Sequence, residues 1–98
     1  MAPTKTHPVS MDGFDFTPRE LTIKAGEAVE WTNTADPDWH SATHVPDAGR
    51  KVVFDSPDIF AGDPAYSFTF DAAGKYDYHC RNHSHMKGVI TVESVSEK

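Results

Sequence analysis

Residues 76–88, Tyr-Asp-Tyr-His-Cys-Arg-Asn-His-Ser-His-Met-Lys-Gly, contain the only cysteine of the chain, three of its six histidines and one of its three methionines. Within this stretch Cys80, His83 and Met86 stand at C-x-x-H-x-x-M spacing. Strong thiolate and imidazole ligands combined with a weak axial thioether point to copper as the metal. We therefore interpret residues 76–88 as half of a copper site.

The other half requires a second histidine from elsewhere in the chain. His40 is the best candidate, because it follows the apolar run 28–33, which is predicted to be a strand that can bring it back toward Cys80. His44 lies at an even offset from His40 and would share its strand face, so it stays as an alternative. The predicted metal ligands are His40, Cys80, His83 and Met86.

Length and charge limit the remaining possibilities. The 98 residues predict a single domain, 1–98, with frayed ends at 1–6 and 94–98. Nine basic against fifteen acidic residues give a net charge of −6, which argues against nucleic acid or anionic membrane as a partner. No apolar run is long enough to span a membrane, and residues 1–6 lack the apolar core of a secretory signal, so we expect a mature form or an excised domain.

Short runs of alternating polarity dominate the chain. Turn residues separate these runs, and helical periodicity never persists beyond a turn or two, so the pattern predicts an all-β sandwich. Residues 46–64, rich in Asp, Gly and Pro, are predicted to form a long irregular excursion. The predicted strands are 7–11, 20–24, 28–33, 40–45, 66–70, 75–80 and 89–92, with Leu21 and Ile23, Val29 and Trp31, and Tyr76, Tyr78 and Cys80 facing inward.

Several motifs, taken in order, resemble the cupredoxin family of type 1 copper proteins, and within it the amicyanins more than plastocyanins or pseudoazurins. The resemblance covers nearly everything from Phe14 to Glu93. The short spacing from Cys80 to Met86 is similar to that of amicyanins. The motifs are Phe-Asp-Phe-Thr-Pro-Arg-Glu-Leu at 14–21, Ala-Gly-Glu at 25–27, Trp-Thr-Asn at 31–33, Tyr-Ser-Phe-Thr-Phe at 66–70 and Ala-Gly-Lys-Tyr-Asp-Tyr-His-Cys at 73–80.

The resemblance implies a Greek-key β-sandwich and a function. A cupredoxin of this kind would be a monomeric, mononuclear copper protein outside the cytoplasm, for example in the periplasm. It would not be an enzyme, and it would carry single electrons between protein redox partners by cycling between Cu(I) and Cu(II). The edge of His83 would be the electron port where partners dock, with Met86 and Pro46 in its rim.

The resemblance also implies hydrogen bonds to the cysteine sulfur. The backbone N–H of Ser41 is expected to point at it. Asn82 stands where amicyanins and plastocyanins have proline, so its restored N–H could be a second donor that raises the reduction potential.

Two other functions stay open. A copper-delivery module would use exchangeable ligands, and the surplus histidines His44, His79 and His85 favour it. His79 is expected on the strand face opposite Cys80, and His85 is expected to be exposed. Alternatively, the chain is one type 1 copper domain of a larger copper oxidoreductase.

Overall fold

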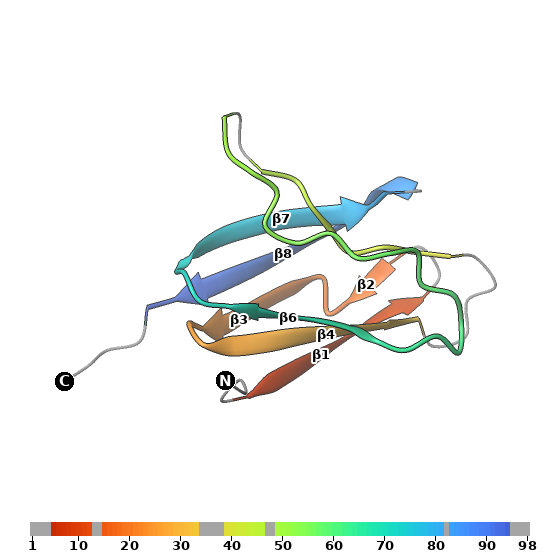
Figure 1. Cartoon of the computed structure of the whole chain (residues 1–98), viewed down its shortest axis with the longest axis horizontal. Coiled ribbons are helices and arrows are strands. Elements are labelled where there is room, and N and C mark those ends of the chain that lie inside the picture. Colours follow the sequence, from red (N-terminus) through yellow and green to blue (C-terminus); the bar gives the residue numbers. More distant parts are fainter. Residues whose placement is uncertain (1–4, 13–14, 34–38, 47–48, 82, 95–98) are drawn as a thin grey trace.

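The computed structural model describes residues 5–12, 15–33, 39–46, 49–81 and 83–94. Two four-stranded sheets pack face to face, and the described residues form no helix (Figure 1). No helix that could cross a membrane is therefore found in these ranges. The strands are β1 (Thr6–Asp12), β2 (Asp15–Thr17), β3 (Glu20–Lys24), β4 (Glu27–Asn33), β5 (Thr43–His44), β6 (Tyr66–Phe70), β7 (Gly74–Cys80) and β8 (His83–Glu93).

Each sheet combines parallel and antiparallel pairs. The first has the order β2-β1-β4-β6, in which β1 and β4 run parallel with Val9 opposite Trp31. The second has the order β3-β8-β7-β5, in which β3 and β8 run parallel with Leu21 opposite Ile90. The predicted all-β sandwich is confirmed, and β8 lies in the interior of its sheet between β3 and β7.

The inward faces of both sheets form one core of aliphatic and aromatic side chains. Val29 and Trp31 are fully buried from β4, and Tyr78 and Cys80 are buried from β7, as their alternation predicted. The Trp31 ring stacks on Phe54, with ring centroids 5.2 Å apart, and meets Tyr78 edge-on at 5.5 Å. Tyr78 and Cys80, two residues apart on β7, both belong to this core, so the cysteine adjoins the aromatic cluster.

Tyr78 and Gly88 face each other across the β7–β8 pair. A Cβ atom added at Gly88 would lie 2.5 Å from Cζ of the Tyr78 ring, which is far inside van der Waals contact. The Tyr78 side chain is itself fully buried, so its ring has no room to move outward. Glycine at position 88 therefore allows the tyrosine ring to lie flat against the backbone of β8.

Two predicted strands differ from the structure by more than one residue at an end, and the short strand β2 was not predicted. The run 40–45 forms only the short strand β5, because residues 40–42 pair instead with the segment 56–59. The last strand begins at His83 rather than at residue 89, so the histidine lies at the start of β8. The irregular excursion at 46–64 is confirmed for residues 49–64, which contain two isolated bridges at Asp55 and Ile59.

Candidate metal centre

Three of the four predicted ligands lie together at one end of the sandwich. The ligand atoms of His40, Cys80 and His83 are all within 4.8 Å of one another. The Cys80 Sγ lies 3.7 Å from Nδ1 of His40 and 3.5 Å from Nδ1 of His83. Three ligands arranged trigonally at about 2.1 Å from one ion are about 3.6 Å apart, so this cluster fits a single metal ion.

The cluster is shielded from water on most sides. His40 and Cys80 are fully buried, while His83 is half-buried. The imidazole rings of His40 and His83 are 5.2 Å apart between centroids and inclined at 59°. A thiolate and two imidazoles without a nearby carboxylate in the cluster are soft and borderline ligands, which suit copper better than magnesium or calcium.

Main-chain pairing holds His40 in place. Its N–H donates to the Ile59 carbonyl at 3.1 Å, and its own carbonyl accepts the Ile59 N–H at 2.7 Å. The same Ile59 carbonyl accepts a hydrogen bond from Nδ2 of the buried Asn33, at the end of β4. The backbone of the histidine is therefore anchored to β4 through Ile59.

Cys80 and His83 lie at the adjoining ends of two paired strands. Cys80 is the last residue of β7 and pairs with His83, the first residue of β8, and the register shifts between His79 and Cys80. The Ser41 N–H donates to the Cys80 Sγ at 3.4 Å, which confirms the expected hydrogen bond to the sulfur. Asn82, the expected second donor, lies outside the described residues.

Met86, the fourth predicted ligand, is buried on β8 in the same core cluster as Cys80. Because Met86 is only 1% exposed, its expected place in an exposed rim around His83 is wrong. Pro46 is not part of such a rim either, since it lies beside Tyr76 and Asp77, toward the middle of β7.

An exposed aromatic pair lies beside the cluster instead. The ring centroids of Trp39 and Phe60 are 5.8 Å apart. Trp39 is 41% exposed and Phe60 is 49% exposed. They neighbour His40 and Ile59, which pair with each other. The pair was not predicted, although the sequence held one signal for it, namely two large aromatic residues in otherwise polar, irregular segments.

The remaining histidines lie apart from the cluster. His44 is buried, accepts the Val53 N–H at its Nδ1 at 2.9 Å and stacks on Phe54, so its ring has a structural environment of its own. His79 pairs with Thr43 and borders a hollow with Val45, Asp77 and Lys87. His85 is exposed, as predicted.

The chain matches the family model described as "Copper binding proteins, plastocyanin/azurin family" over residues 4–93. Amicyanin-alpha of Methylorubrum extorquens is 38% identical over 93 residues, which cover 94% of this chain and 76% of that protein. The chain spans 63% and 55% of the lengths of two further curated amicyanins, from Paracoccus versutus and Paracoccus denitrificans.

Solved structures give the same result. A reduced amicyanin variant superposes with a TM-score of 0.78 at 32% identity, covering 90% of this chain and 82% of that one. A copper-containing nitrite reductase from Thermus scotoductus SA-01 superposes with a TM-score of 0.80 at 32% identity, covering 92% of this chain but only 23% of the reductase. The cupredoxin-type sandwich predicted from the sequence motifs is thereby confirmed.

Proposed function

The chain belongs to the plastocyanin/azurin family of copper-binding proteins, and on this premise we propose that it is a mononuclear type 1 copper protein that carries single electrons between protein redox partners. It acts as a carrier and not as an enzyme. The observation that supports this function most directly is the cluster of His40, Cys80 and the half-buried His83, whose mutual distances suit one ion.

The proposed ligands are His40, Cys80, His83 and Met86. The first three would supply a thiolate and two imidazoles as strong ligands, and the thioether of the buried Met86 would supply a fourth, weaker one. Bound copper would supply the one-electron Cu(I)/Cu(II) couple. The chain supplies the burial that excludes water from Cys80 and the Ser41 N–H that stabilises negative charge on the sulfur.

Rigidity around the ligands supports electron transfer over other uses of copper. Ile59 holds His40 through both the N–H and the carbonyl of the histidine. Cys80 ends β7, an interior strand of its four-stranded sheet. A site that cannot rearrange its ligands requires little reorganisation when the charge on the metal changes, which favours rapid transfer.

We place the docking surface for redox partners around His83, the least buried of the three clustered ligands. The exposed Trp39 and Phe60 give this end of the molecule an apolar surface, and the net charge of −6 suits a partner with basic groups around its own docking face.

We also propose that the protein is a single-domain monomer in the periplasm or another extracytoplasmic compartment. Fractionation of cells that express the gene with its natural flanking sequence tests that location.

The test of the function is the visible spectrum of the copper(II) protein. An intense thiolate-to-copper band is expected for the wild type, and Cys80→Ala should abolish it while the fold is retained. A colourless copper complex of the intact protein would contradict the type 1 site.

Copper delivery, the first alternative, needs ligands that exchange readily with a recipient. The burial of His40 and Cys80 argues against it. If a mild competing chelator strips copper quickly from the reduced protein, delivery gains support. Retention through repeated redox cycles supports the electron carrier.

The second alternative, one domain of a larger copper oxidoreductase, has one specific observation in its favour. The chain resembles about a quarter of the length of the Thermus scotoductus nitrite reductase. The mass of the natural gene product, measured in its source cells, distinguishes a free carrier from such a domain.

A further inference from the structure

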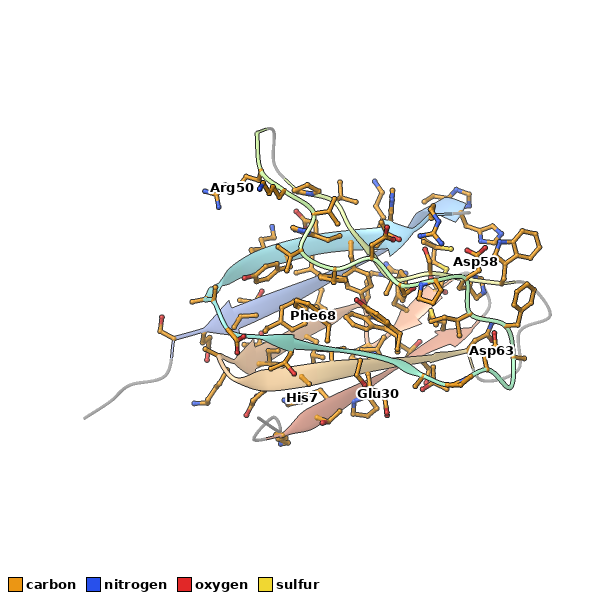
Figure 2. The ribbon with its side chains drawn as sticks, viewed as in Figure 1. His7, Glu30, Arg50, Asp58, Asp63 and Phe68 are labelled. Carbon is orange, nitrogen blue, oxygen red and sulfur yellow. The ribbon has the colours of Figure 1, made fainter. Side chains whose placement is uncertain are left out.

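Arg81, the residue that follows Cys80, connects three parts of the chain. Its guanidinium donates to Asp55 Oδ1 at 2.7 Å, to Asp58 Oδ1 at 2.8 Å and to the Ser56 carbonyl at 3.1 Å. Its backbone N–H donates to the Ser41 Oγ at 2.8 Å. Figure 2 shows Asp58 at the end of the sandwich where β7 terminates. One side chain therefore ties the end of β7 to the segment 55–58.

The segment 55–58 belongs in turn to the stretch that holds His40. Ser56 and Ala42 are joined twice, by the Ser56 N–H to the Ala42 carbonyl at 3.0 Å and by the Ala42 N–H to Ser56 Oγ at 2.9 Å. Ile59 pairs with His40 in both directions, as described above. Movement of the segment 55–59 would therefore displace the backbone of His40.

Arg81, Asp55 and Asp58 are all exposed, and a single exposed ion pair contributes little. This contact differs because one guanidinium binds several acceptors at once. A planar guanidinium that binds three acceptors, with the Thr43 Oγ1 at 3.4 Å as a fourth, restricts direction as well as distance. A lysine ammonium would not reproduce these fixed donor directions. Arg81 is also adjacent to Cys80 in sequence. The backbone of Arg81 is therefore bonded directly to that of the cysteine.

We propose that Arg81 is a positioning residue of the metal centre: its side chain fixes the segment 55–59 against the end of β7 and so fixes His40 relative to Cys80. The inference rests on the proposed function, since the fixed spacing limits ligand movement as the metal changes charge. Arg81 itself is not a ligand. It acts through Asp55, Asp58 and the main chain of Ser56.

The test uses a variant that removes this link without altering the net charge. Arg81→Gln combined with Asp58→Asn keeps the charge at −6, so long-range repulsion between two protein molecules is unchanged. The matched control is Arg19→Gln with Asp15→Asn, which removes an exposed ion pair of 3.1 Å between the first residue of β2 and the residue that precedes β3. Both are measured as copper proteins for electron self-exchange by NMR line broadening and for the thiolate-to-copper band.

We expect the self-exchange rate of the Arg81 and Asp58 double variant to be lower than that of the wild type by a factor of about three or more. Its thiolate-to-copper band should also be shifted. The control pair should match the wild type in both readouts. Arg81→Lys, which keeps the charge but not the planar donor set, should resemble the double variant more than the wild type. Copper content and thermal unfolding confirm that each variant is folded.

Unchanged self-exchange and an unchanged band in the double variant would overturn the positioning role. Full recovery in Arg81→Lys would also overturn it, because charge alone would then be sufficient. These results differ from failure of the proposed function, which would appear as a missing band or absent electron exchange in the wild type itself.

Discussion

The backbone N–H of Ser41 points at the sulfur of Cys80, 3.4 Å away, although 39 positions separate the two residues in the sequence. Both groups are fully buried, so no water competes for the hydrogen bond. The contact links the segment carrying His40 to the strand carrying the cysteine. It also places a fixed partial positive charge beside the proposed thiolate ligand.

Removing this donor should lower the reduction potential. A fixed N–H stabilises the more negative sulfur, weakens its donation to Cu(II) and is tolerated better in the more electron-rich Cu(I) state, so it favours reduction. Ser41→Pro lacks the N–H and is expected to lower the potential by tens of millivolts, where about 59 mV is a tenfold change for one electron. Voltammetry at a single pH measures the shift.

Ser41→Ala is the matched control for that measurement, because it keeps the N–H and loses only the hydroxyl that Arg81 and Thr43 contact. Its potential should lie closer to the wild type than that of Ser41→Pro. An equal decrease in both variants would assign the effect to the hydroxyl.

The choice between His40 and His44 has a direct test. His40→Ala should lose the intense copper band, because it removes a ligand of the proposed site. His44→Ala should keep the band but lower the free energy of unfolding by about 1–3 kcal/mol, since the Val53 N–H loses its acceptor. Visible spectra and thermal unfolding of both variants measure this. The reverse pattern would mean that the ligand was misassigned.

Gly88→Ala should destabilise the protein through a collision with the Tyr78 ring. The added methyl group would lie 2.5 Å from the ring, and forcing the buried pair apart should cost about 1–3 kcal/mol. Adding Tyr78→Ala should make the two effects strongly non-additive, because the ring that Gly88 accommodates is then absent. Denaturant unfolding of the four proteins in this cycle measures the coupling. Strict additivity would contradict the contact.

Tyr78 also predicts a loss of stability at high pH. Burial raises the pKa of its hydroxyl to about 12, above the ordinary value of 10 in the unfolded chain. The folded protein therefore retains this proton longer than the unfolded chain, so the stabilisation is fully present below pH 10 and is lost as the pH rises toward 12. The loss from this group should be about 2–3 kcal/mol. Tyr78→Phe should flatten that part of the pH profile in denaturant unfolding.

The local half of the candidate site could be predicted because its residues are close in sequence. The spacing of Cys80, His83 and Met86 indicates a copper site without any knowledge of the fold, since few metals prefer that ligand set. His40 required a further step, because its approach depends on how the strands assemble. Its place after the apolar run 28–33 made His40 the best candidate, and the structure brings His40 alone of the two histidines into the cluster.

Contacts formed by irregular segments could not be predicted. The residues 55–59 have no periodic pattern, so nothing in the sequence indicated that they would pair with residues 40–42 or that Arg81 would bind Asp55 and Asp58. The early start of β8 was missed for a related reason. Histidines and a lysine at 83–87 suggest a loop, yet pairing of His83 with Cys80 and of Lys87 with His79 continues the ladder.

The interior position of β8 has a consequence for synthesis on the ribosome. The last strand is the hydrogen-bonded partner of both β3 and β7, and it carries His83 and Met86. While residues 83–93 are still inside the ribosomal exit tunnel, β3 and β7 have no strand between them. His40 and Cys80 also lack the third clustered ligand, His83. The nascent chain can therefore pair β1 with β4 early, but it can complete its second sheet and its copper ligands only once β8 has emerged.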